Sequence, residues 1–170
     1  TNLIAEIGDW VFTESVLVIQ KLKEVYNGQV QISLNLSPNQ VKHISKSSPL
    51  LRYCQSKNAL NKSIILEITE TVLMNDTCET LDLISNFRDS GMQVAIDDFG
   101  TGYSSLAYIR RYQIDYIKID REFVKDLPHS NDSAVICRSI IQMAHNLGIQ
   151  VIAEGVETIE QKEWLDQADC

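Results

Sequence analysis

The sequence has no long apolar run and little positive charge. No apolar stretch reaches the roughly 20 residues that a membrane-spanning helix needs, and no secretory leader is visible. Fifteen Lys and Arg stand against 23 Asp and Glu, which gives a formal net charge of −8. Proteins that bind nucleic acids usually have a basic face, so we expect no DNA binding and no membrane contact by this span. A small phosphate ligand is compatible with this charge, because a bound divalent metal inverts the charge locally.

Paired cysteines are missing as well. The cysteines lie far apart without a CxxC pair, at Cys54, Cys78, Cys137 and Cys170. This spacing lacks the pattern of a zinc site, and a disulfide framework is unusual in a chain of this size. We therefore expect reduced thiols and a cytoplasmic location for this span, even where the parent protein is anchored to a membrane elsewhere.

Strand-like and helix-like segments alternate along the chain. We expect strands at residues 29–36, 63–69, 93–97, 116–120 and 150–154. Helical patterns lie between and around them, at residues 14–25, 48–57, 78–90, 104–112 and 133–147. Repeated β-then-α order predicts parallel strands joined by helical crossovers. No linker, low-complexity tract or charge block interrupts the order, so residues 1–170 are interpreted as one α/β domain.

The predicted strands share a polar C-terminal end. Successive side chains of a strand point to opposite faces, and each strand has one apolar face and a second face that becomes polar near its end. A lone buried charge is costly, and the C-terminal strand ends of a parallel barrel carry its catalytic groups. We therefore expect one ring of polar side chains at that end: Asn35, Glu67, Asp97, Asp98, Lys118 and Glu154.

Asp97 and Asp98 form the centre of this ring. Adjacent carboxylates repel each other, so their presence at a strand end suggests a cation between them. The ring offers hard oxygen donors apart from Lys118, which suits Mg²⁺ or Mn²⁺ rather than zinc. Simpler interpretations stay open: the two aspartates can cap a turn before Gly100, Asn35 can begin a turn, and Lys118 can pair with Asp97 structurally.

Five motifs resemble, in order, the successive signatures of the EAL domain family. They are Asn35-Leu36-Ser37, Leu66-Glu67-Ile68-Thr69-Glu70, Asp97-Asp98-Phe99-Gly100-Thr101-Gly102-Tyr103-Ser104-Ser105-Leu106, Ile117-Lys118-Ile119-Asp120 and Ala153-Glu154-Gly155-Val156-Glu157. Members of this family are bacterial phosphodiesterases that hydrolyse cyclic di-GMP to linear pGpG on a modified (β/α)8 barrel. The resemblance runs from near the first residue to the last, so it implies this fold and this activity for the parent protein.

The resemblance also implies which residues hold metal. Asn35, Glu67 and Asp97 would bind one ion, and Asp97 would bridge to a second ion held by Asp98. Glu154 would face both ions. Two such ions, roughly 3.5–4 Å apart, can generate hydroxide, neutralise a phosphodiester and stabilise the leaving oxygen.

The remaining roles concern catalysis and the loop after the aspartates. Glu154 would help orient or deprotonate the attacking water, and Lys118 would hold that water or the phosphate oxygens. Glu70 would steady the loop that begins at Asp98, although it can equally cap the next segment. Glu157 has the same two interpretations. In the loop Phe99-Gly100-Thr101-Gly102, the glycines permit tight bending and movement when a ligand or a partner binds.

The first and last signatures of the family have no counterpart in this sequence. These are the Glu-Ala-Leu strand, whose Glu is a metal ligand, and a late Gln-Gly motif. We therefore expect an incomplete TIM-like barrel that lacks about two to three strands and forms a homodimer or another oligomer, swaps segments or is marginally stable. Sensory or GGDEF-type domains are expected elsewhere in the parent chain.

Other functions remain open at this point. Without one metal-ligating Glu, the isolated span can be inactive even where the parent is an enzyme. A catalytically inactive cyclic di-GMP receptor or dimerisation module is the main alternative, although such domains usually have substitutions at these acidic positions. A metal-assisted proton abstraction with Lys118 as the base is a further alternative, which the Asp97-Asp98 loop disfavours.

Overall fold

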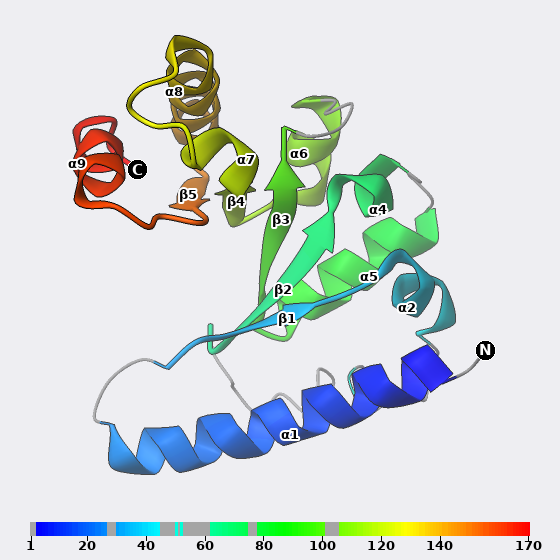
Figure 1. Cartoon of the computed structure of the whole chain (residues 1–170). Helices are drawn as coiled ribbons and strands as arrows, with labels where there is room; N and C mark the ends of the chain where they lie inside the picture. The colour runs from blue at the N-terminus through cyan, green and yellow to red at the C-terminus, as the bar shows by residue number, and fades with distance from the viewer. Residues whose placement is uncertain are drawn as a thin grey trace. The chain divides into compact units, whose positions relative to one another are not determined.

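The computed structural model describes residues 3–26, 30–44, 50, 52, 62–74, 78–100 and 106–170. They belong to two compact units, residues 1–94 and residues 95–170. Figure 1 shows the helices and strands of both units along the chain. No helix in the described ranges combines the length and the apolar character that are needed to cross a membrane.

The first unit contains a long helix, two parallel strands and several shorter helices. Its elements are α1 (Leu3–Val25), β1 (Ile32–Asn35), α2 (Pro38–His43), β2 (Ile64–Thr69), α4 (Glu70–Met74), α5 (Cys78–Asp89) and the first two residues of β3 (Gln93–Phe99). β1 and β2 pair in parallel, and Asn35 lies opposite Glu67 at their C-terminal ends. The predicted parallel arrangement is therefore confirmed for these two strands.

Helix α1 buries one face and exposes apolar side chains on another. Phe12, Val16 and Ile19 are buried, and their spacing of four and three residues places them on one side of a helix. This helix contacts β1.

In strand β2 all residues except Thr69 are buried, as expected for a parallel strand that is covered on both faces.

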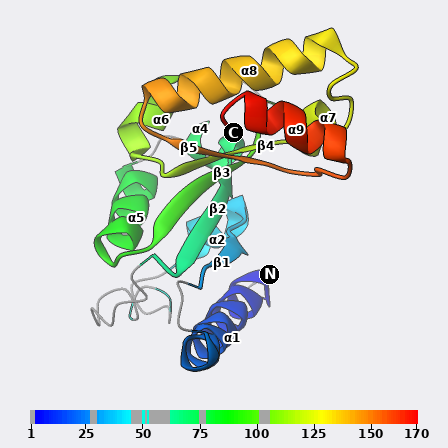
Figure 2. The same cartoon turned by 90° about the vertical axis from the view of Figure 1, so that its left-hand side faces the viewer.

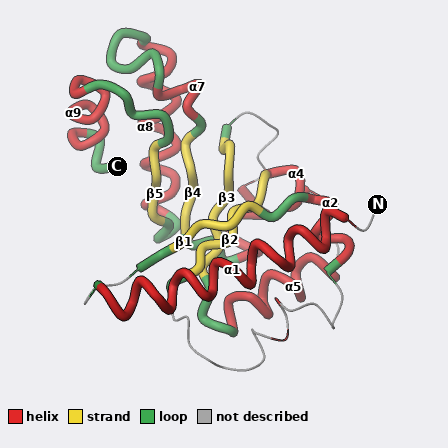
Figure 3. Tube along the Cα trace, turned by 60° about the horizontal axis from the view of Figure 1, so that its bottom comes forward, coloured by secondary structure: helices red, strands yellow, loops and turns green. Residues whose placement is uncertain are grey.

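The second unit continues β3 and adds two further parallel strands. Its remaining elements are α6 (Leu106–Tyr112), β4 (Tyr116–Ile119), α7 (Arg121–Val124), α8 (Asn131–Asn146), β5 (Gln150–Ala153) and α9 (Ile159–Gln167). β4 pairs in parallel with both β3 and β5, so it lies between them; Figure 3 shows the three strands side by side. Helix α8 packs against β4 and β5, as Figure 2 shows.

Side-chain caps define where the helices of this unit begin. Ser130 accepts a hydrogen bond from the backbone N–H of Ser133 at 3.2 Å, at the start of α8. At the start of α9, Thr158 accepts from the N–H of Gln161, whose own side chain accepts from the N–H of Thr158. This reciprocal pair satisfies two backbone donors that a helix end leaves without partners.

The observed element bounds differ from the predicted ones in ways that have physical causes. The five strands are confirmed within a few residues, although β3 continues to Phe99 because its end is distorted rather than terminated. Helix α1 begins at Leu3, well before the predicted residue 14. Four of the described helices were not predicted: α2, α4 and α7 are too short to show a helical period, and α9 has few apolar residues. The predicted helix at 48–57 lies mostly outside the described residues; the structure describes only Leu50 and Arg52 of it, and both are helical.

Candidate metal centre

The C-terminal end of β3 brings two adjacent carboxylates to one site. The register between β3 and β4 shifts between Ile96 and Phe99, so Asp97 and Asp98 together lie opposite the single residue Lys118. Such a β-bulge places an extra residue in one strand. Asp98 has a φ of +52°, in the left-handed region that Asp adopts more readily than most residues. In a regular strand the two side chains would point to opposite faces, and the bulge removes this restriction.

Glu154 joins these aspartates from the end of β5. One carboxylate oxygen each from Asp97, Asp98 and Glu154 lies within 4.8 Å of the others. The backbone N–H of Glu154 donates to the carbonyl of Ile119 at 3.1 Å, which fixes its position beside the end of β4. Hard divalent cations bind oxygens at about 2.0–2.6 Å, so ligands on opposite sides of one ion are about 4–5 Å apart. The three carboxylates therefore fit a hard divalent cation.

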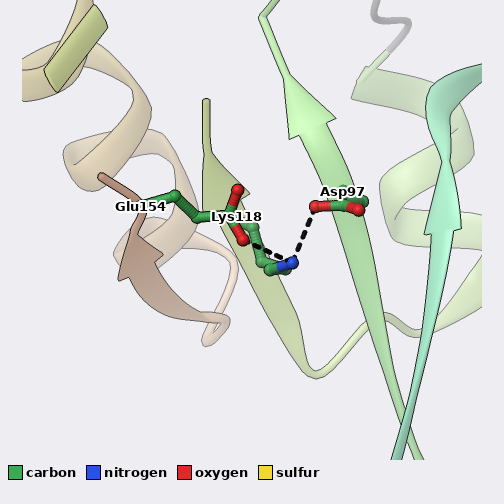
Figure 4. Close-up of polar contacts among 3 residues, drawn as sticks. All are labelled: Asp97, Lys118 and Glu154. Atoms are coloured by element: carbon green, nitrogen blue, oxygen red, sulfur yellow. Dashed lines mark hydrogen bonds and ion pairs between the residues drawn. The ribbon is translucent and has the colours of Figure 1, made fainter. Parts of the chain in front are cut away.

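Lys118 lies between two of these carboxylates. Its Nζ is 2.8 Å from Oδ1 of Asp97 and 2.5 Å from Oε1 of Glu154, as Figure 4 shows. The residue is only 7% exposed, and a buried ammonium group is stable only when it is paired. The structural pairing of Lys118 with Asp97 that the sequence left open is therefore present.

The electrostatic environment of Asp98 is unfavourable for its own charge. Partial burial, the charge of Asp97 and a side-chain hydrogen bond with Asp120 raise the pKa of Asp98 above its ordinary value. Glu154 adds a further negative charge. A cation bound in this group would oppose these effects, because an opposite charge favours the ionised carboxylate.

Asp120 is a member of this acidic group that the predicted ring did not include. It caps α7, where its Oδ1 accepts a hydrogen bond from the N–H of Glu122 at 2.6 Å. The signal was present in the sequence, since Asp120 lies two residues after Lys118 and therefore on the same face of the strand.

Two further predicted ligands lie together in the first unit. Asn35 and Glu67 are opposite each other at the ends of β1 and β2. Asn35 is exposed, whereas Glu67 is 6% exposed. The backbone N–H of Leu36 donates to the carbonyl of Glu67 at 2.8 Å, so the pairing continues past Asn35. Each unit therefore brings together its own share of the predicted ring.

Two further predicted residues lie at or just before helix starts. Glu70 begins α4 and is buried. Glu157 is exposed before α9, and its N–H donates to the side chain of Gln161 at 2.7 Å. Their predicted roles beside the loop stay predictions, and Thr101 and Gly102 lie outside the described residues.

The start of the predicted loop is tightly packed. Phe99 is buried, and Gly100 has a φ of +100°. A Cβ at Gly100 would lie 3.0 Å from the ring of Phe123, closer than most such carbon contacts. The unusual backbone angle predicted for Gly100 is therefore confirmed, and this position accepts only glycine without strain.

Comparison with known proteins connects this site to a family. The model of the family described as "EAL domain" matches residues 1–170. The sequence is 36% identical over 174 residues to the bifunctional diguanylate cyclase/cyclic di-GMP phosphodiesterase MucR of Pseudomonas aeruginosa. That match covers all of this chain and 25% of MucR, so the chain spans about a quarter of its relative's length.

Solved structures agree with this match. The PaMucR phosphodiesterase in complex with c-di-GMP superimposes with a TM-score of 0.87 at 34% identity, covering 100% of this chain and 69% of that one. A manganese and cy-diGMP complex of Klebsiella pneumoniae BlrP1 gives 0.74 at 32% identity, covering 89% of this chain and 39% of that one. These similarities confirm the predicted α/β fold, which is consistent with an incomplete TIM-like barrel.

Proposed function

This chain belongs to the EAL domain family, and we propose that its parent protein hydrolyses cyclic di-GMP to linear pGpG with the help of two divalent ions. The observation that carries this proposal is the group of Asp97, Asp98 and Glu154, whose carboxylates converge from the ends of β3 and β5. The names of the similar proteins support the substrate, since MucR is a cyclic di-GMP phosphodiesterase.

The carboxylates of this group would hold the ions. Divalent ions bound there supply the positive charge that activates water and offsets the charge of the phosphate. Asp97, Asp98 and Glu154 offer only oxygen ligands, which favours Mg²⁺ or Mn²⁺. We propose that Asn35 and Glu67 serve the same ions, as the family pattern implies. The complexes of BlrP1 with manganese and with calcium support a site for hard cations.

Two side chains would act directly on the reacting groups. Glu154 is only partly buried, so its carboxylate can orient the attacking water and accept its proton. The ammonium of Lys118 would hold that water or the phosphate oxygens, where negative charge develops in the transition state. The contacts of Lys118 with Asp97 and Glu154, and the convergence of their carboxylates, support this assignment.

We also propose which domains accompany this span, where the protein is located and how it assembles. Because MucR combines a diguanylate cyclase with a phosphodiesterase, we propose that sensory or GGDEF-type domains accompany this span in its parent chain. We further propose a cytoplasmic location, in keeping with the widely separated cysteines, and a homodimeric assembly. The loop from Phe99 to Gly102 would then connect the assembly to the site.

Turnover of cyclic di-GMP tests the enzyme. This chain and a form extended at both ends are incubated with cyclic di-GMP and Mn²⁺, and pGpG is measured by chromatography. We expect the extended form to produce pGpG and Glu154→Gln to lose at least 100-fold in rate, as general acid–base groups contribute about 10²–10⁴-fold. Glu163→Gln, an exposed change on α9, is the matched control. Tight binding without turnover would instead indicate a receptor.

A further inference from the structure

We propose that Lys118 is the counter-ion of the metal centre. Its ammonium group pairs with Asp97 and Glu154 before ions bind, and it leaves at least one of them when an ion enters. This inference rests on the proposed function, because it concerns the same carboxylates. It adds a role for Lys118 that precedes its contact with water or phosphate.

The geometry makes Lys118 a direct competitor for the ligand oxygens. Its Nζ contacts Asp97 at 2.8 Å and Glu154 at 2.5 Å, and these carboxylates belong to the group that converges within 4.8 Å. The lysine belongs to β4, and the two carboxylates come from the strands on either side of it. The ammonium group therefore bridges three neighbouring strand ends through the oxygens that a cation would use.

The charges of the site allow Lys118 to pair with the carboxylates and still allow a divalent ion to bind. The ammonium offsets the repulsion between Asp97 and Glu154, while Asp98 and Asp120 leave the whole group with excess negative charge. A divalent ion is therefore still attracted when Lys118 is in place. Because the ion and Nζ need the same oxygens, Nζ must leave at least one carboxylate when the ion binds.

Displacement of Lys118 would connect metal binding to substrate binding. The lysine side chain is flexible and has three donors on Nζ. Donors released from Asp97 or Glu154 become available to an anionic phosphate at the same strand ends. The metal and the phosphodiester should therefore bind cooperatively, with Lys118 as the residue that couples them.

Removal of the lysine charge tests this role by metal binding rather than by turnover. We expect Lys118→Gln to bind Mn²⁺ more tightly than the unaltered chain, by about tenfold, because the ion no longer competes with a positive charge for the oxygens of Asp97 and Glu154. Free Mn²⁺ is counted by electron paramagnetic resonance. Without Mn²⁺ the variant should unfold at a lower temperature, because two carboxylates lose their cation. Mn²⁺ should raise its melting temperature more than that of the unaltered chain.

Lys125→Gln is the matched control. This lysine also forms an ion pair at 2.5 Å, with Glu122, but both side chains are about half exposed and outside the acidic group. We expect unchanged Mn²⁺ affinity for this variant. A Lys118→Gln protein that binds Mn²⁺ equally or more weakly would overturn the inference, provided that Asp97→Asn abolishes binding in the same assay. If the unaltered chain binds no Mn²⁺, both the proposed metal centre and this role of Lys118 are wrong.

A second measurement uses the unaltered chain and does not depend on the folding of a variant. Lysine acetylation by acetic anhydride is followed by peptide mass spectrometry with and without saturating Mn²⁺. We expect acetylation of Lys118 to become several-fold faster with Mn²⁺, while that of Lys125 stays constant. An unchanged or lower rate at Lys118 would contradict its displacement.

Discussion

At the scale of single residues, Asp98 combines an uncommon backbone angle with an unfavourable charge. Its φ of +52° and the β-bulge place its carboxylate beside that of Asp97. The raised pKa of Asp98 means that the folded protein holds its proton more tightly than the unfolded chain does. In the metal-free protein, the charge on Asp98 therefore opposes folding at neutral pH.

Neutralising Asp98 should stabilise the metal-free protein slightly. We expect Asp98→Asn to raise the melting temperature at pH 7 by about 1–2 °C, a small effect because the side chain is largely exposed to solvent. The gain should be present above the folded-state pKa and disappear as the pH falls toward the ordinary value of 3.8. Thermal unfolding followed by circular dichroism from pH 3 to 7 measures this. A gain that persists at pH 3 would indicate another cause.

Gly100 offers a test of local packing. Gly100→Ala adds a Cβ at 3.0 Å from the ring of Phe123 and also strains a φ of +100°. Gly148→Ala is the matched control, because its φ is +73° but nothing lies within 4 Å of the new Cβ. We expect a loss of about 1 kcal/mol at Gly148 and a clearly larger loss at Gly100. Urea unfolding measures both, and equal losses would refute the close contact.

At the scale of elements, Gln161 holds the start of α9 to the chain after α7. Its Oε1 accepts from the N–H groups of Glu157 and Thr158, and its Nε2 donates to the carbonyl of Lys125 at 3.1 Å. The residue is only 4% exposed. These bonds fix the segment that follows Glu154, so they contribute to the position of that carboxylate.

Replacing Gln161 should destabilise the second unit. We expect Gln161→Ala to lower the free energy of unfolding by about 2–3 kcal/mol, because buried backbone groups lose their partners. Gln167→Ala, an exposed position near the end of the same helix, should change it by less than about 0.5 kcal/mol. Urea denaturation of both variants distinguishes them. Similar losses would contradict a specific role for these bonds, because alanine has a higher helix propensity than glutamine.

The elements also show which structural features the sequence could predict. Alternating apolar and polar residues located the strands and the polar strand ends, because this period is a local property. The cap at Thr158 and Gln161 is also readable from sequence, although few apolar residues follow it. The bulge at Asp97 and Asp98 cannot be predicted from the sequence, because it depends on how β3 pairs with β4. For Lys118, the sequence left open the pairing with Asp97, whereas the contact with Glu154 depends on how β4 pairs with β5.

At the scale of the whole molecule, the exposed apolar side chains of α1 predict self-association. Leu3, Ile7 and Trp10 are 61%, 51% and 63% exposed, and contiguous exposed apolar side chains commonly mark interaction surfaces. We expect concentration-dependent association by light scattering, weakened by Trp10→Glu. Gln20→Glu, on an exposed position of the same helix, is the control and should leave association unchanged. A monodisperse monomer at all concentrations would contradict this prediction.

The predicted ring of polar residues is divided between the two units of the molecule. Asn35 and Glu67 meet in the first unit, and Asp97, Lys118 and Glu154 meet in the second. Strand parity predicted a single ring, because side chains on one face of parallel neighbours lie together at the strand ends. That Asn35 and Glu67 serve the same ions as Asp97, Asp98 and Glu154 is a proposal from the family pattern.

Anomalous X-ray diffraction from crystals soaked in Mn²⁺ tests the proposed metal centre most directly. The proposal predicts manganese peaks about 2.2 Å from carboxylate oxygens of Asp97, Asp98 and Glu154, with Asn35 and Glu67 among the ligands. It also predicts that Nζ of Lys118 has left at least one of its two carboxylates. Crystals with bound manganese elsewhere, or with no peak beside Asp97 at saturating Mn²⁺, would contradict it.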